Sequence, residues 1–206
     1  MRQPLARLWF VATAIVVVIG VIVQLFAVDT DAGHFRGTAA VLNIFVFFTI
    51  DSNLLLGATS LLLAIRLERS SVLFRALRLS AVLSIAVVGI VFHIALAALY
   101  EFAGLAQVAN VLLHTVTPIM GVLGWLVFGP RRQTDARVVG WSVAYPVAWL
   151  VFTLVRGPFV GDFYPYPFLE VLAHGYPRVL LNSLIVAVLF LALAAGAAAL
   201  DRRLPR

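Results

Sequence analysis

Residues 43–60 of the chain read NIFVFFTIDSNLLLGATS. This stretch is about as long and as apolar as a membrane-spanning helix, which needs about 20 mostly apolar residues. Near its centre, however, it carries Thr49, Ile50, Asp51, Ser52 and Asn53. An Asp at the middle of a transmembrane helix adds roughly 2.5 to 3.5 kcal/mol to the free energy of insertion, so such residues usually face a bundle interior and mark function. The stretch therefore predicts a membrane helix with a polar site inside it.

The composition of the whole chain is that of an integral membrane protein. Of its 206 residues, 63% are hydrophobic and 12% are charged, and the mean hydropathy is +1.07. The net charge of +6 could indicate nucleic-acid binding, but the basic residues are dispersed among loops and form no basic face, so no nucleic-acid partner is expected. The chain has no Cys, which excludes disulfides and thiolate nucleophiles.

The apolar segments predict an all-α fold, a polytopic bundle of six transmembrane helices in one domain of residues 1–206. The expected spans are 8–28, 41–65, 79–100, 108–128, 138–155 and 179–200. The first span is too long for a signal peptide and lacks a small-residue cleavage site, so we expect it to be retained. Nothing in the sequence indicates the oligomeric state.

The basic residues, all Arg, predict the orientation. Twelve of the fifteen fall on one side of the predicted spans, and the opposite side holds only three: Arg36, Arg156 and Arg178. Because cytoplasmic loops carry an excess of basic residues, both termini are predicted to be cytoplasmic. The use of Arg without Lys hints at a GC-rich bacterial genome, and hence at a multi-pass protein of a bacterial plasma membrane.

Polar residues of several spans are expected at similar depth in the outer half of the bilayer. If the second span begins near Val41, a rise of 1.5 Å per residue puts Thr49 to Asn53 near mid-membrane, and His114 lies about two turns into the fourth span. Helical spacing places Thr49, Ser52 and Asn53 on one side of the helix and Asp51 on another. The candidate partners of Asp51 are His93, Tyr145 and a neighbouring backbone group. We call this layer of polar residues the slab. It should also contain Asn110 and Thr117, on the same helical stripe as His114, together with His93 and Asn182.

The slab could support hydrolysis of an ester. A hydroxyl becomes a nucleophile when a base in hydrogen-bond reach accepts its proton, and Thr49 and His114 fit these roles. Side-chain amides that could stabilise an oxyanion come from Asn53, Asn110 and Asn182, and Asp51 could orient the imidazole. The substrate would be a membrane lipid or fatty ester that enters laterally. Neither a cofactor nor a metal is expected, because His93, His114, His174 and Asp51 could offer ligands but no close-spaced pair exists.

Each polar residue also has a structural interpretation. Thr in a helix often donates to the carbonyl four residues earlier, here that of Phe45, and Ser, Thr and Asn commonly hold transmembrane helices together. The chain could therefore be a non-catalytic lipid-binding or membrane-organising protein. A small transporter is a weaker alternative, because no inverted repeat is visible.

Four motifs resemble a known family: FFTIDSNLL (47–55), LLHTVTPIMGVLGWLVFGP (112–130), YPVAWLVFTLVRG (145–157) and YPYPFLEVLAHGY (164–176). Together they resemble the bacterial branch of the six-span membrane proteins related to the androgen-induced gene product and the androgen-dependent TFPI-regulating protein. The resemblance implies an integral-membrane hydrolase of fatty acid esters of hydroxy fatty acids that uses a Thr and a His, here Thr49 and His114. It assigns no catalytic role to YPYPFLEV, which is expected to close the pocket and fix the sixth span.

Overall fold

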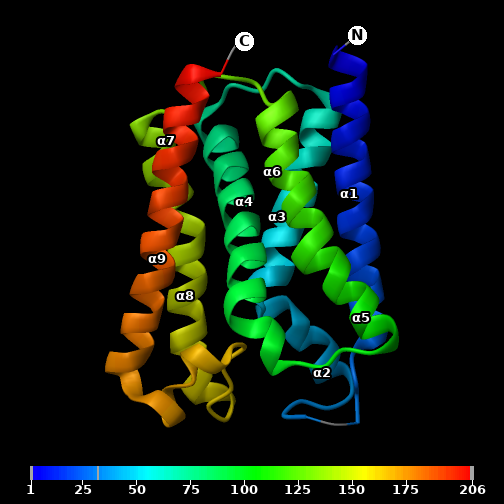
Figure 1. The fold of residues 1–206 in the computed structure, drawn as a ribbon. Coiled ribbons are helices and arrows are strands. Elements are labelled where there is room, and N and C mark those ends of the chain that lie inside the picture. Colours follow the sequence, from blue (N-terminus) through cyan, green and yellow to red (C-terminus); the bar gives the residue numbers. More distant parts are fainter. Residues whose placement is uncertain (1, 32, 205–206) are drawn as a thin grey trace.

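The computed structural model describes residues 2–31 and 33–204, and this part of the chain is helical without any strand (Figure 1). Six helical segments are long and apolar enough to cross a membrane, which confirms the predicted all-α membrane fold. Their bounds are Gln3–Ala27, Phe48–Ile65, Val72–Leu99, Gly104–Phe128, Ala136–Val160 and Val171–Arg203.

Several of these segments are built from more than one helix. The α-helices are α1 (Arg2–Ala27), α2 (Thr38–Asn43), α3 (Phe48–Ile65), α4 (Val72–Val91), α5 (Gly104–Val111), α6 (Thr117–Phe128), α7 (Ala136–Ser142), α8 (Ala144–Arg156) and α9 (Val171–Arg203). Short 3₁₀ turns are η1 (Ile44–Val46), η3 (Ala97–Leu99), η5 (Gly157–Val160) and η6 (Pro167–Leu169). Two π-helical turns, η2 (Phe92–Leu96) and η4 (Leu112–Val116), continue α4 and precede α6.

Helix α4 lies in the middle of the bundle, with α1, α3 and α6 on one side and α8 and α9 on the other (Figure 1). Its residues enter both of the larger buried clusters, through Leu79, Leu83 and Val87 in one and Ala81 and Ile85 in the other. A helix that is apolar all round is expected to be buried in this way.

Both termini lie at one end of the bundle, here called the termini end, as an even number of spans requires (Figure 1). The distal end carries the loop segments of residues 28–31, 33–37 and 157–170 (Figure 1). Most of the described Arg residues lie in the loops and helix ends of the termini end, whereas Arg206 and the side chain of Arg2 are outside the described part. The cytoplasmic position of the termini end stays a prediction from the positive-inside rule.

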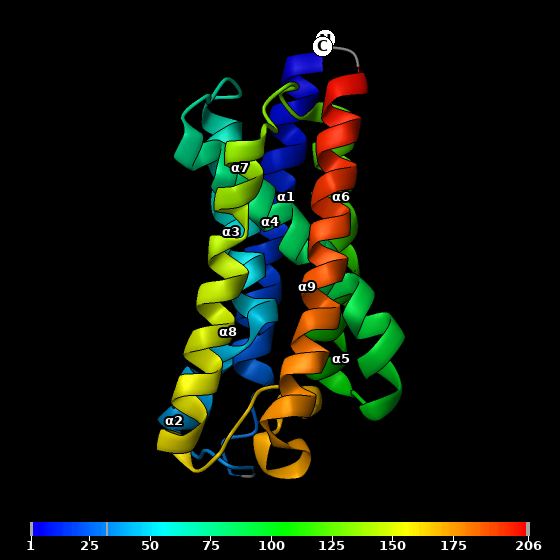
Figure 2. The ribbon, with the colours of Figure 1, turned by 90° about the vertical axis from the view of Figure 1, so that its left-hand side faces the viewer.

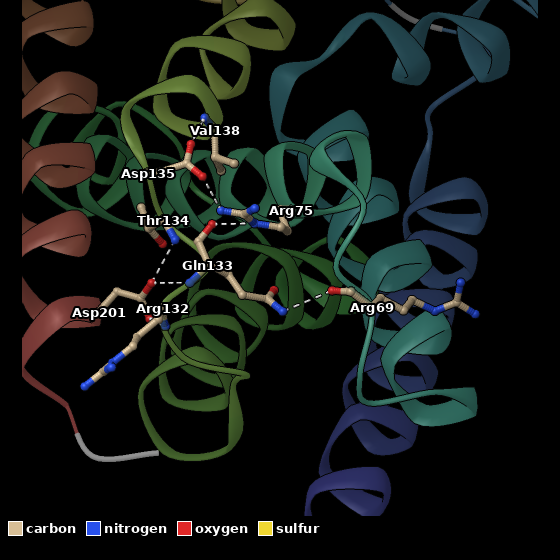
Figure 3. A network of polar contacts seen from close by, with 8 residues as sticks. All are labelled: Arg69, Arg75, Arg132, Gln133, Thr134, Asp135, Val138 and Asp201. Carbon is tan, nitrogen blue, oxygen red and sulfur yellow. Dashed lines mark hydrogen bonds and ion pairs between the residues drawn. The ribbon is translucent and has the colours of Figure 1, made fainter.

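Polar contacts fasten the loop before α7 to α9 at the termini end (Figure 3). The buried carboxylate of Asp201 accepts hydrogen bonds from the backbone N–H groups of residues 132–134, at 3.0, 2.7 and 2.8 Å. Arg75 forms an ion pair of 2.5 Å with Asp135 and donates to the Gln133 carbonyl at 2.8 Å. Backbone donors of this loop, which has no secondary structure to satisfy them, thereby gain acceptors.

The second span differs from the prediction of one continuous helix over 41–65. The helix breaks at Phe47, whose backbone is extended (φ −80°, ψ 127°), and α3 begins at Phe48. Side chains from other segments form hydrogen bonds with the backbone groups that lose their helical partners at the break. Trp149 Nε1 donates to the Val46 carbonyl at 3.1 Å, and the N–H of Thr49 donates to the Tyr166 hydroxyl at 3.2 Å. Thr49 therefore lies in the first turn of the spanning helix rather than at its middle.

Candidate functional site

Thr49 meets His114 between α3 and η4. The Thr49 side chain is 7% exposed, and its Oγ1 lies 3.2 Å from His114 Nε2. The hydroxyl does not donate to the carbonyl of Phe45, as the structural interpretation expected, because the break at Phe47 removes the helical turn that would carry that bond. The predicted juxtaposition of this hydroxyl and this imidazole is thus present in the fold.

The shape of the chain around His114 follows from Pro118. Proline has no N–H to donate and its ring crowds the carbonyl four residues earlier, which here belongs to His114. The helix opens at this point into the π-helical turn η4, a feature that often occurs at functional sites. His114 Nδ1 lies 3.3 Å from the Asn110 carbonyl, and the ring stacks on Phe92 with centroids 4.2 Å apart. These two contacts fix the orientation of the imidazole.

The hydrogen bonds are consistent with one direction of proton donation. Because a carbonyl only accepts, the Nδ1 contact with Asn110 requires the proton to be on Nδ1 and leaves Nε2 as an acceptor. The Thr49 hydroxyl then donates to Nε2. This is the arrangement that a general base needs to accept a proton from a hydroxyl nucleophile.

Tyr166 supplies a second hydroxyl to the site. Its Oη lies 3.2 Å from Thr49 Oγ1 and accepts the Thr49 N–H at the same distance. The residue sits between η5 and η6 in the distal loop, and its ring stacks on Phe168 at 5.4 Å and meets Phe47 edge to face at 5.8 Å. Closure of the pocket by the YPYPFLEV motif agrees with the prediction, but its contact with Thr49 was not predicted.

Asn53 was predicted as an oxyanion donor, and the structure gives it another arrangement. Its fully buried amide donates to the carbonyls of Thr49 at 2.8 Å and Leu113 at 3.2 Å. Its Oδ1 accepts the Thr117 hydroxyl at 2.5 Å. Both donors of the amide are therefore used within the protein, and the side chain links α3 to η4 and α6 directly beside the Thr49–His114 pair.

Three other predicted residues also have partners away from the Thr49 hydroxyl. Asn182 donates to the Phe168 carbonyl at 2.9 Å, which fixes α9 to η6 as expected for the sixth span. Ser52 lies 3.1 Å from the Tyr145 hydroxyl, and His93 lies 3.0 Å from Thr115 Oγ1 on an exposed face. Asn110 reaches His114 through its backbone carbonyl, while its buried Oδ1 has no hydrogen-bond partner among the described residues.

Asp51 does not orient the imidazole, because it points to a different side of α3 from Thr49. The acceptor for His114 Nδ1 is the Asn110 carbonyl instead. Asp51 is only partly buried and lies in the first turn of α3, since that helix begins at Phe48. A carboxylate is stabilised at a helix N-terminus by the macrodipole. The position of the helix start therefore gives a physical reason why a carboxylate is tolerated at Asp51.

Thr49 and His114 both line an apolar cavity. The cavity has a volume of about 170 Å³, and its polar side chains are Thr49, His114, Tyr166 and Ser183. The rest of its lining comes from aliphatic and aromatic residues of α3, α4, η2, α8, η6 and α9. A cavity of this composition suits a hydrocarbon chain with one polar group at its end.

The cavity reaches the outer surface of the bundle between α8 and α9. Val147 of α8 and Leu191 of α9 both line it, and they are 52% and 51% exposed on the molecular surface. Figure 2 shows α8 and α9 side by side on the face turned to the viewer, with α4 behind them. This face belongs to helices that are long and apolar enough to cross a membrane, so the opening is on the side of the bundle rather than at either end.

The described residues contain no group of three or more His, Asp or Glu side chains that could hold a metal ion. Of the residues considered for such a site, His93 lies on an exposed face and His174 is exposed in the first turns of α9.

Fold and site together define a multi-pass α-helical membrane protein in which a Thr–His pair lines an apolar cavity on the side of the bundle. Comparison of the chain with protein-family models, with curated proteins and with solved structures finds no match. The chemistry of the site therefore carries the functional argument.

Proposed function

We propose that the chain is an intramembrane hydrolase of lipid or fatty acid esters, with Thr49 as nucleophile and His114 as general base. The observation that carries this proposal is the 3.2 Å contact between Thr49 Oγ1 and His114 Nε2, two groups that line the apolar cavity. A hydroxyl, an oriented base and a space for an acyl chain are the elements that acyl transfer requires.

The proposed reaction has two stages. His114 Nε2 accepts the Thr49 proton as Thr49 Oγ1 attacks the ester carbonyl, and it returns this proton to the departing alcohol. Water then attacks the acyl-threonine while His114 Nε2 accepts a proton from it, and His114 returns this proton to Thr49 Oγ1 as the fatty acid leaves. The Asn110 carbonyl stabilises the imidazolium that forms in each stage, because it accepts the Nδ1–H.

The location of the site supports a substrate delivered by the membrane. An ester whose acyl chain enters between α8 and α9 brings its carbonyl to Thr49 while the chain occupies the apolar lining. This arrangement agrees with the activity that the resemblance implies, hydrolysis of fatty acid esters of hydroxy fatty acids. We accordingly propose the chain as a bacterial plasma-membrane member of that six-span family.

Labelling by an active-hydroxyl probe tests the proposal. A long-chain alkyl fluorophosphonate should label the purified wild type and stop its hydrolysis of a fatty acyl ester, whereas Thr49→Ala should show neither labelling nor turnover. Thr59→Ala is the matched control, because the Thr59 hydroxyl is equally buried but donates only to carbonyls of its own helix, at 2.8 and 3.1 Å. Equal turnover by wild type and Thr49→Ala would refute the proposal.

A non-catalytic lipid-binding protein is the second candidate, and the apolar lining of the cavity is what favours it. Such a protein would retain lipid through purification in wild type and Thr49→Ala alike, with no labelling of either. Mass spectrometry of bound lipid therefore separates the two candidates.

A further inference from the structure

We propose that Tyr166 is a further catalytic residue of this site, and that its hydroxyl and the Thr49 backbone N–H form the oxyanion hole. The inference rests on the proposed function and adds a residue that the sequence had assigned only to closing the pocket. Tyr166 Oη touches the reacting atom directly, since it lies 3.2 Å from Thr49 Oγ1.

Two of the three side-chain amides expected to form the oxyanion hole are engaged elsewhere, and the third, that of Asn110, does not line the cavity. The Asn53 amide donates to two backbone carbonyls, and the Asn182 amide donates to the Phe168 carbonyl. Hydrogen-bond donors at the Thr49 hydroxyl must therefore come from other groups. The Tyr166 O–H and the Thr49 N–H are both there, and both belong to residues that line the cavity.

The Thr49 N–H is available because of the break at Phe47. The first helical hydrogen bonds of α3 are those of Ile50 and Asp51 to the Phe47 carbonyl, so the Thr49 N–H precedes them and has no helical acceptor. It donates instead to Tyr166 Oη, a bond that an oxyanion could replace. This N–H is also one of the first in an 18-residue helix. It therefore lies at the positive end of the helix macrodipole, which stabilises the negative charge that develops in the reaction.

Tyr166 is held in place and remains a donor. Pro165 and Pro167 flank it, Leu169 N–H bonds to its carbonyl at 2.9 Å, and Trp149 packs near its ring at 5.9 Å. Burial raises the pKa of Tyr166 to about 12, so its hydroxyl is protonated at neutral pH. In the resting site its proton points to Thr49 Oγ1, whose own proton is donated to His114.

In the proposed step the bond from Thr49 Oγ1 to the carbonyl carbon forms, and the carbonyl π-electron pair moves onto its oxygen. The hydroxyl proton of Thr49 passes to His114 Nε2. Thr49 Oγ1 becomes an ester-type oxygen and a poorer acceptor, so the Tyr166 O–H turns to the oxyanion beside the Thr49 N–H. Collapse of the intermediate restores the carbonyl, breaks the bond to the alcohol oxygen, and gives that oxygen the proton from His114.

Tyr166→Phe tests the inference, because it removes the hydroxyl and keeps the aromatic packing. Loss of one oxyanion donor typically lowers kcat by about 10²- to 10³-fold, and that is the decrease expected here with KM little changed. Tyr164→Phe is the matched control, since Tyr164 is buried in the same loop against Leu169 and Val179 but does not line the cavity. It should hydrolyse at the wild-type rate, and thermal unfolding of both variants checks that each one folds.

A thionoester substrate separates oxyanion stabilisation from mere positioning of Thr49. Sulfur accepts hydrogen bonds weakly, so the wild type should hydrolyse a fatty acyl ester much faster than its C=S analogue. Tyr166→Phe should reduce this oxygen-to-sulfur rate ratio, because the lost donor contributed to the reaction of the oxygen ester alone. A positioning role would slow both substrates equally and leave the ratio unchanged.

The possible outcomes are distinct. A large loss of kcat with a reduced ratio in Tyr166→Phe, and wild-type behaviour in Tyr164→Phe, supports the inference. Wild-type turnover or an unchanged ratio in a folded Tyr166→Phe overturns it while the proposed function stands. If the wild type itself neither hydrolyses esters nor reacts with the fluorophosphonate, the proposed function and this inference both fail.

Discussion

Replacing Asn53 by Leu should weaken the fold and the site together, because this amide joins the two segments that carry Thr49 and His114. The change removes three hydrogen bonds of a fully buried side chain, at 2.8, 3.2 and 2.5 Å, and keeps a similar volume. Hydrogen bonds between transmembrane helices contribute about 0.6 kcal/mol each on average, and bonds in proteins generally about 1 kcal/mol. The expected loss is therefore about 2 to 3 kcal/mol in the free energy of unfolding.

The effect on hydrolysis should be at least as clear as the effect on stability. Without the amide, α3 and η4 lose a direct link beside the reacting groups, and a misplacement of about 1 Å can lower a rate about 10²-fold. Equilibrium unfolding of the detergent-solubilised protein and kcat for a fatty acyl ester measure the two effects. Thr59→Val is the control, since it removes only bonds within α3 and should cost about 1 kcal/mol with no loss of kcat. If Asn53→Leu matches this control in both measurements, Asn53 does not hold the site together.

Four further changes give separate tests. His114→Ala should lower kcat by about 10²- to 10⁴-fold, the range for a lost general base, and undiminished turnover would exclude His114 from this role. Asp51→Asn should leave kcat unchanged, since the acceptor at His114 Nδ1 is the Asn110 carbonyl and not Asp51; a collapse of activity would show that Asp51 takes part in the reaction. Ala187→Trp should fill part of the cavity and slow the hydrolysis of long-chain esters but not of acetyl esters, and equal slowing of both would argue against an acyl site there. Asp201→Ala should lower the free energy of unfolding by about 3 kcal/mol, because three backbone N–H groups lose their acceptor, and an unchanged unfolding curve would contradict this.

The sequence was sufficient to predict the membrane fold, because a bilayer requires long apolar helices whose composition differs from that of loops. The pairing of Thr49 with His114 was also predictable in outline. Both residues enter from the distal end, and His114 belongs to a helical stripe that starts with Asn110. Depth and helical phase were enough to place them in the same region, although not to give their contact distance.

The start of α3 could not be predicted from local sequence. Hydropathy is continuous from Val41 onward, and the helix nevertheless breaks at Phe47. The groups that satisfy the broken backbone, Trp149 and Tyr166, lie about a hundred residues later in the chain. The later start also changes the local setting of Asp51, which belongs to the first turn of α3 rather than to the middle of a continuous helix.

The roles of the amides and of Tyr166 were likewise set by tertiary structure. An Asn in a membrane helix can donate to a substrate or to a neighbouring carbonyl, and only the position of the Leu113 carbonyl decides this for Asn53. Tyr166 lies in an aromatic, proline-rich loop that is typical of a membrane interface. The one available signal was that its motif combines two rigid prolines with a phenol, which would hold that hydroxyl in a fixed place.

The site of covalent modification tests the central claim most directly. The purified protein should be treated with the alkyl fluorophosphonate, digested, and sequenced by mass spectrometry. The account predicts one adduct on the peptide that contains Thr49, at the Thr49 hydroxyl, and loss of that adduct in His114→Ala. An adduct on another residue of a fully inhibited protein, such as Ser52 or Ser183, would contradict the assignment of Thr49 as nucleophile.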